Sequence, residues 1–156
     1  MTSLDRARWL ALLLPAALLA GAYGSQYFGG LFPCEMCRWQ RWPHFAAVAL
    51  AVLALVTRGV LSRLLVLLAA IAIAVSGAIG VFHAGVEYGW WEGVTACAST
   101  LGGSGDMLDR IMNAPLVRCD VAPWTLAGIS LAGFNAVFSL GGALVILWLA
   151  TRRTAR

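Results

Sequence analysis

The hydrophobic positions of this chain gather into four long apolar stretches, and the short segments between them carry most of the charge. The stretches run from Trp9 to Phe28, from Trp39 to Val56, from Leu64 to Val86 and from Trp124 to Leu149. An α-helix rises about 1.5 Å per residue, so roughly 20 apolar residues cross a bilayer core of about 30 Å. The pattern predicts an all-α fold, an integral membrane antiparallel four-helix transmembrane bundle that forms a single domain over residues 1–156.

The composition excludes a soluble domain and a disordered chain. Hydrophobic residues make up 61% of the 156 residues and charged residues only 12%, against about half and a quarter in globular proteins. All 11 basic residues are arginine, and the net charge is +4. Because these arginines flank the apolar stretches, we interpret the positive charge as a signal of membrane topology and expect no nucleic-acid partner.

The arginines also predict which side of the membrane each loop faces. The termini and the turn at 57–63 hold seven arginines and one acid, whereas the loops at 29–38 and 87–123, counted with Arg41, hold four arginines and six acids. The arginine-rich side stays in the cytoplasm. We therefore expect cytoplasmic termini and two outward-facing loops. The first apolar stretch also resembles a secretory signal, but cleavage there disagrees with this charge distribution.

The long outer loop has one further pattern. Met107, Leu108, Ile111 and Met112 fall on one helical face, with polar residues opposite. This spacing fits a short amphipathic helix in the membrane interface. A loop with a few apolar residues explains it equally well.

Four cysteines carry most of the chemical information. Cys34 and Cys37 form a Cys-Glu-Met-Cys motif in the first outer loop, and Cys97 and Cys119 lie 22 positions apart in the second. None of them falls in the apolar middle of a stretch. Disulfides persist in oxidising compartments outside the cytoplasm, so we expect two cysteine pairs on the outward side.

The close pair has features of a redox couple. Cys37 begins a predicted helix beside Arg38, and both features favour its thiolate. Arg41 follows one turn later. Placing a charged arginine at a membrane entrance costs free energy, so such a residue usually has a functional role or reaches the headgroups. The negative charge of Glu35, between the two cysteines, acts in the opposite direction and tends to raise the pKa of the thiols. The alternative is an inert disulfide with Arg41 reaching the lipid headgroups.

Metal and haem sites are weaker interpretations. Zinc sites combine short-spaced cysteine pairs, and the spacing of Cys97 and Cys119 does not fit, so we predict no metal. His44 and His83 do not supply a second histidine pair for haem. Each is interpreted as an interface residue or as a hydrogen-bonded residue of the bundle.

Taken in order, these features resemble the DsbB-type disulfide-generating membrane oxidoreductases. The similar pieces are the motif from Cys34 to Cys37 followed by Arg-Trp-Gln-Arg-Trp-Pro, then His83 with Glu87, and then the loop cysteines before Trp124. The resemblance covers about residues 9–149. Its most specific element is the Cys-x-x-Cys motif with Gln-Arg just beyond it.

The resemblance implies a bacterial inner-membrane enzyme that generates protein disulfides. Such an enzyme oxidises a periplasmic DsbA-like protein of thioredoxin fold and passes two electrons to a membrane quinone, either ubiquinone or menaquinone. It implies catalytic roles for Cys34, Cys37, Cys97 and Cys119, with Cys97 forming the mixed disulfide with the partner.

The resemblance also implies a quinone site. Cys37 is expected to face the quinone ring, Arg41 to stabilise the thiolate and the reduced quinone oxygen, and His83 to line the same pocket. Two rivals stay open at this point. One is a structural membrane subunit with inert loop disulfides. The other is an enzyme similar to vitamin K epoxide reductase, although that family places its loop pair before its Cys-x-x-Cys motif.

Overall fold

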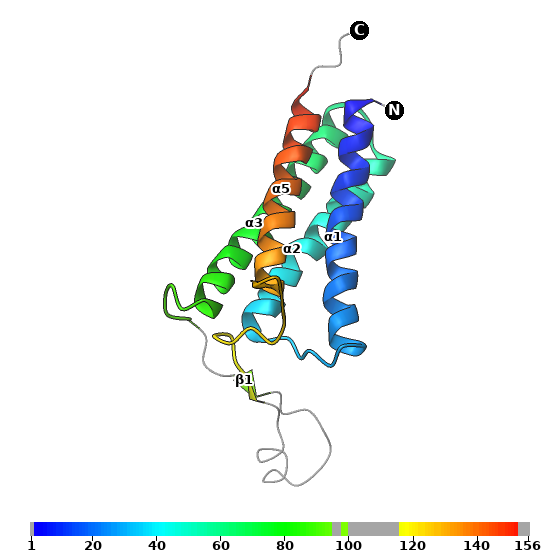
Figure 1. Ribbon diagram of the computed structural model, residues 1–156. Coiled ribbons are helices and arrows are strands. Elements are labelled where there is room, and N and C mark those ends of the chain that lie inside the picture. The colour runs from blue at the N-terminus through cyan, green and yellow to red at the C-terminus, as the bar shows by residue number, and fades with distance from the viewer. Residues whose placement is uncertain (1, 95–97, 100–115, 153–156) are drawn as a thin grey trace.

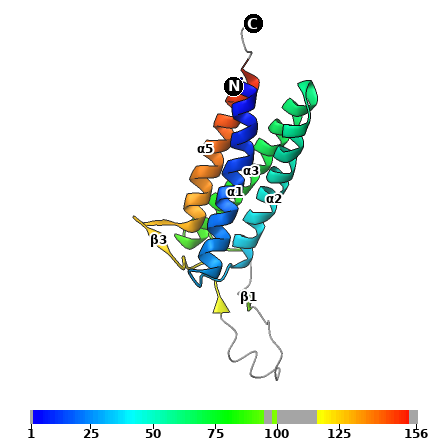
Figure 2. The ribbon, with the colours of Figure 1, turned by 90° about the vertical axis from the view of Figure 1, so that its right-hand side faces the viewer.

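The long helices of the described residues stand side by side in one bundle (Figures 1 and 2). The computed structural model describes residues 2–94, 98–99 and 116–152. Within that part the helices are α1 (Ser3–Tyr27), α2 (Glu35–Val56), α3 (Gly59–Glu87) and α5 (Leu131–Thr151). The all-helical class predicted from the sequence is confirmed for these elements.

Short strands occur only at the loop end of the bundle among the described residues. β1 (Ala98–Ser99) pairs with β2 (Leu116–Val117), and β3 (Thr125–Leu126) pairs with β4 (Ile129–Ser130). The first residues of α1 and the end of α5 lie at the opposite end (Figure 1). The bundle therefore separates a terminal end from a loop end that carries the cysteines.

Small side chains allow the helices to approach closely. Among the described residues, twelve buried ones form the main core, and nine of them are alanines: Ala7, Ala11, Ala47, Ala51, Ala54, Ala69, Ala70, Ala143 and Ala150. At Gly80, an added Cβ would lie 3.0 Å from the carbonyl oxygen of Ala132, so α3 and α5 meet nearly backbone to backbone. Interfaces of small residues are typical of helices packed in membranes.

Three of the described helices, α1, α3 and α5, are long and apolar enough to cross a membrane by length and composition. The helix α2 is of similar length, with 22 residues. It begins with a polar segment that includes Gln40, Arg41 and His44, which lowers its hydropathy. The same polar segment lines the candidate site described below.

The last helix begins at Leu131, seven residues after the start of the apolar stretch at Trp124. Residues 125–130 form a hairpin instead, with positive φ angles of 51° at Ala127 and 79° at Gly128. Two consecutive positive φ angles fit the tight turn that joins two twisted strands. Tyr88 fixes this hairpin to the end of α3, because its hydroxyl donates to the carbonyl of Gly128 and accepts from the N–H of Ser130.

Two expectations fall on residues outside those that the structure describes. They are the short amphipathic helix at residues 106–113 and the position of Cys97. Both remain predictions.

Candidate redox site and apolar cavity

The Cys-x-x-Cys motif forms the start of α2. Cys34 is the N-cap residue, and its sulfur accepts a hydrogen bond from the backbone N–H of Cys37 at 3.3 Å. The two sulfur atoms lie 3.2 Å apart, with the thiol of Cys34 donating to Cys37. Cys34 is buried and Cys37 is partly exposed. The capping geometry thus holds both sulfurs together at the positive end of a helix.

His83 reaches the motif from α3. Its Nε2 lies 3.4 Å from the sulfur of Cys34 and 3.6 Å from Oε1 of Glu87. The side chains of His83 and Glu87 are only 1% and 2% exposed. The pair is therefore buried beside the thiols, where a proton on the imidazole is matched by the carboxylate.

Cys119 joins this group from the second outer loop. It packs with Cys34, Met36 and Val86 in a small buried cluster. The sulfur atoms of Cys34 and Cys119 and a ring nitrogen of His83 all lie within 4.8 Å of one another. These three atoms are of the types that bind zinc, and the expectation that the site holds no metal stays a prediction. Cys97 lies outside the described residues.

The two thiols of the motif differ in acidity. Both residues lie before the apolar stretch that begins at Trp39, and so outside the predicted membrane-spanning segment. The hydrogen bond to Cys37, together with burial, raises the pKa of Cys34 to about 12. The same hydrogen bond lowers the pKa of Cys37, against burial and the nearby carboxylate of Glu87. Because one S–H donates to the other sulfur, the negative charge is favoured on Cys37.

Cys37 lies between two cavities. The outer cavity, of about 330 Å³, is lined by Cys34, His83 and Glu87 together with residues of the outer loops. The inner cavity, of about 220 Å³, lies among α1, α2 and α5, and its polar lining comes mainly from Gln40, Arg41, His44 and Asn135. Cys37 lines both cavities, as do Leu31, Phe32 and Pro123. One sulfur atom can thus take part in chemistry on either side.

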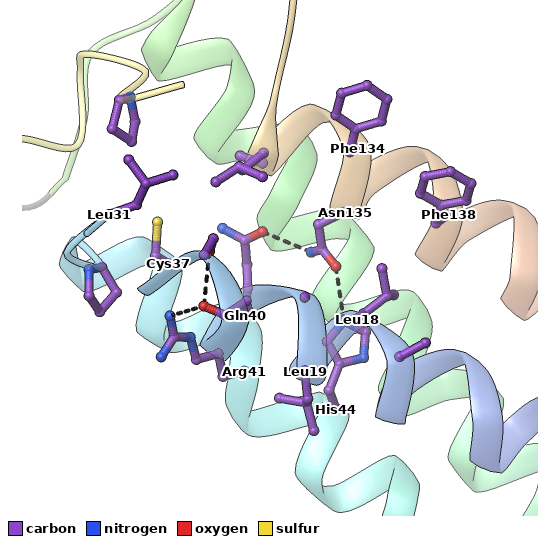
Figure 3. Close-up of a pocket in the computed structure, with 18 of the residues that line it drawn as sticks. Leu18, Leu19, Leu31, Cys37, Gln40, Arg41, His44, Phe134, Asn135 and Phe138 are labelled. Carbon is purple, nitrogen blue, oxygen red and sulfur yellow. Dashed lines mark hydrogen bonds between the residues drawn. The ribbon is translucent and has the colours of Figure 1, made fainter. Parts of the chain in front are cut away.

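Arg41 is held in the wall of the inner cavity by α1 (Figure 3). Its Nη1 donates to Oε1 of Gln26 at 2.7 Å, and its Nη2 donates to the carbonyl of Ala22 at 3.2 Å. The guanidinium carbon stands 4.5 Å from the ring centroid of Tyr23. Its Nε is buried and has no hydrogen-bond partner among the described residues. One N–H of a side chain that lines the cavity is therefore unsatisfied.

A chain of hydrogen bonds connects the two cavities through the bundle. The amide nitrogen of Gln40 lies 2.8 Å from Nδ1 of His83, and its amide oxygen accepts from Nδ2 of Asn135 at 2.8 Å. Oδ1 of Asn135 lies 2.9 Å from Nε2 of His44. Figure 3 shows Asn135 between Gln40 and His44. Side chains from α2, α3 and α5 thus form one buried polar network.

The structure places the predicted site residues in two groups. Cys37 and Arg41 share the inner cavity, whereas His83 faces the outer cavity with Cys34 and is connected to the inner one through Gln40. The sequence analysis did not identify Asn135. A signal was available, since a polar residue inside an apolar stretch is usually paired or functional. It gave His44 only a structural interpretation.

Comparison with known proteins agrees with this geometry. The family model described as disulfide bond formation protein DsbB matches residues 5–149, which is nearly the whole chain. Searches among curated proteins and among solved structures find no match. Together with the helical bundle and the paired thiols, the match to the family model leads to one conclusion: the chain belongs to the DsbB family of disulfide bond formation proteins.

Proposed function

We propose that this chain is a protein-dithiol:quinone oxidoreductase. It would oxidise a periplasmic DsbA-like protein of thioredoxin fold and pass the two electrons through Cys97/Cys119 and then Cys34/Cys37 to a membrane quinone. The observation that carries this proposal is the position of Cys37, which lines both the thiol-containing outer cavity and the apolar inner cavity.

The first exchange takes place on the outer loop. A thiolate of the soluble partner attacks the Cys97–Cys119 disulfide and forms a mixed disulfide with Cys97, and Cys119 leaves as a thiolate. The partner's second thiolate then releases Cys97 and closes the partner's own disulfide. The partner has lost two electrons and two protons, and the loop pair has become a dithiol.

The second exchange transfers the two electrons from the loop dithiol to the Cys-x-x-Cys motif. Cys119 lies within 4.8 Å of Cys34, so its thiolate can attack the Cys34 sulfur of a Cys34–Cys37 disulfide. Cys37 then leaves as a thiolate. A thiol of lower pKa is the better leaving group, and the pKa of Cys37 is the lowered one of the pair. Cys97 completes the step by displacing Cys34 from Cys119.

His83 and Glu87 support the charge changes of this step. With Nδ1 of His83 accepting from the amide of Gln40, the ring proton resides on Nε2, where it faces the sulfur of Cys34. The buried carboxylate of Glu87 lies 3.6 Å from the same nitrogen and favours the proton at that position. The pair thus holds a proton next to the sulfur that is attacked.

The inner cavity suits a quinone ring, either ubiquinone or menaquinone. An apolar cavity of about 150 Å³ is enough to bind benzene, and this one measures about 220 Å³. The free N–H on Nε of Arg41 is a donor for a ring oxygen. A quinone bound there supplies an acceptor for two electrons and two protons, and Cys37 and Arg41 are the residues that would hold it.

The proposed topology follows from charge and helix length. We infer that α2 supplies a fourth span, because its apolar stretch from Trp39 to Val56 has the length of a membrane-crossing helix. The partly buried hydrogen bonds of Arg41 offset the cost of placing it near the membrane entrance. Arginine-rich termini in the cytoplasm then place the cysteine loops in the periplasm, on the outer face of a bacterial inner membrane.

Turnover tests this function. Purified protein is mixed with a reduced DsbA-like protein and a soluble ubiquinone analogue, with a menaquinone analogue in parallel, and the loss of quinone absorbance is followed. Cys37→Ala and Cys97→Ala are expected to abolish turnover and Arg41→Ala to slow it. Arg58→Ala is the matched control, because Arg58 is exposed, precedes α3 far from the cysteines along the bundle and lines neither cavity. Absence of turnover with both quinones would leave the cysteines with a structural role and contradict the proposal.

A further inference from the structure

His44 forms part of the inner cavity beyond Arg41. It lies three residues after Arg41 on α2, so it is the next neighbour along the same helix face. Its side chain is only 3% exposed. Asn135 from α5 lies beside it in the cavity wall (Figure 3).

The hydrogen-bond network assigns the ring proton of His44 to Nε2. Three oxygen atoms face this nitrogen: Oδ1 of Asn135 at 2.9 Å, Oγ of Ser76 at 2.9 Å and Oγ of Ser139 at 3.4 Å. The amide oxygen is an acceptor only. Both serine hydroxyls donate elsewhere, Ser76 to the carbonyl of Gln40 and Ser139 to Asn135. None of the three neighbours has a hydrogen left to give to Nε2, so Nε2 carries the ring proton and donates.

This assignment leaves Nδ1 of His44 as a hydrogen-bond acceptor. Nδ1 is buried and has no partner among the described residues. A buried acceptor without a donor is unfavourable, so a ligand hydroxyl that reaches it gains a hydrogen bond and removes that cost. A carbonyl oxygen has no hydrogen to donate and cannot satisfy it.

We propose that Nδ1 of His44 accepts a hydrogen bond from a hydroxyl group of a quinol, so that the inner cavity binds the reduced ring more tightly than the oxidised ring. This inference rests on the proposed function and extends it. The N–H of Arg41 serves the oxygens of both redox forms, since each can accept a hydrogen bond. His44 is the group that distinguishes them.

The preference has a consequence for the direction of electron flow. One hydrogen bond changes affinity by roughly threefold to tenfold. Tighter binding of the reduced form by that factor makes the bound quinone a stronger oxidant by about 14 to 30 mV, since tenfold corresponds to about 30 mV for a two-electron couple. His44 would thus favour the movement of electrons from the thiols of the motif into the cavity.

Two substitutions separate the two ring nitrogens. His44→Gln places an amide N–H near the position of Nε2, where it can still donate to Asn135, and leaves no acceptor at the position of Nδ1. His44→Asn places an amide oxygen near the position of Nδ1. Both are made in the full chain with Cys37→Ser, which prevents electron transfer to the ring while changing the cavity by a single atom.

The measurement is the equilibrium affinity of a short-chain ubiquinol and of the matching ubiquinone. His44→Gln is expected to weaken ubiquinol binding by roughly threefold to tenfold and to change ubiquinone binding by less than about twofold. His44→Asn is expected to retain part of the preference for ubiquinol. Equal losses for both ligands, no loss for either, or a loss of preference in His44→Asn as large as that in His44→Gln would each overturn the inference.

A second readout uses the chain with its native cysteines. The inhibition constant of added ubiquinol during turnover is expected to rise in His44→Gln by the same factor. If the native chain does not reduce quinone at all, the proposed function fails. If it reduces quinone but shows no preference for ubiquinol, only the inference about His44 fails.

Discussion

The acidity of Cys37 can be traced to one hydrogen bond, and removing that bond gives a sharp test. The thiol of Cys34 donates to the sulfur of Cys37 at 3.2 Å, and this contact is the largest cause of the lowered pKa of Cys37. Cys34→Ala removes the donor. We therefore expect the substitution to raise the pKa of Cys37.

The magnitude follows from the strength of such bonds. A hydrogen bond to a charged group contributes about 1.5 to 3 kcal/mol, and one pKa unit corresponds to about 1.4 kcal/mol. Cys37 is partly exposed, so water replaces some of the lost stabilisation and the low end applies. We expect an increase of about one pKa unit. Because a lowered pKa keeps the thiolate present to lower pH, its loss moves the titration midpoint upward.

The assay is the pH dependence of alkylation of Cys37 in the fully reduced protein, with peptide mass spectrometry to identify the modified cysteine. Cys34→Ser is the matched control, because its hydroxyl can donate to the same sulfur and should keep most of the effect. A midpoint in Cys34→Ala that equals or lies below that of the native chain would refute the assignment of the thiolate to Cys37.

Three further predictions concern the cavity wall and the bundle. Arg41→Lys keeps the charge but loses the planar group that donates to two acceptors on α1. The KM for quinone should therefore rise about tenfold, while thiol exchange with the soluble partner in the absence of quinone keeps its rate. A slower thiol exchange would contradict this explanation. Gly85→Ala places a Cβ against the ring of Trp91 and should lower the free energy of unfolding in detergent by about 1 to 3 kcal/mol. Gly21→Ala, where a Cβ meets no atom within 4 Å, should not lower it, and equal losses would argue against the packing explanation. Asn135→Leu leaves the amide oxygen of Gln40 without its donor and removes one of the acceptors that face His44. It should cost about 2 kcal/mol in the same unfolding measurement, and an unchanged stability would show that the network adds nothing.

The helices were predictable because apolar length alone defines them, but their ends were not. The stretch from Trp124 looks continuous in hydropathy, since Leu126 and Ile129 are apolar although they belong to the hairpin β3–β4. Gly128 is a residue type that favours turns, because glycine adopts positive φ readily. Ala127 carries no such indication, since its positive φ is imposed by the turn and not by its residue type.

The candidate site was predictable only where its members are close in sequence. The pair Cys34–Cys37 and the following Arg41 form a local motif on one helix. The connection from His83 through Gln40 to Asn135 joins three helices, and one sequence contains no information about which faces of those helices meet. The division of the site into two cavities depends on the same packing, so it too required the structure.

The distribution of unsatisfied polar atoms ties the fold to the proposed chemistry. In the part of the chain that the structure describes, three buried side-chain atoms have no hydrogen-bond partner: Nε of Arg41, Nδ1 of His44 and Oε2 of Glu87. The rest of the buried network that surrounds them is paired, as the cost of burying polar groups requires. All three of these residues line a cavity, Arg41 and His44 the inner one and Glu87 the outer one. The unsatisfied hydrogen-bonding atoms of the buried network thus belong to residues that line the cavities. These are the places where a quinone and a reacting thiol would bind. If that capacity serves ligands, filling the inner cavity should stabilise the chain against unfolding. Arg41→Ala or His44→Gln should each reduce that gain more than Arg58→Ala does, because Arg58 lines neither cavity.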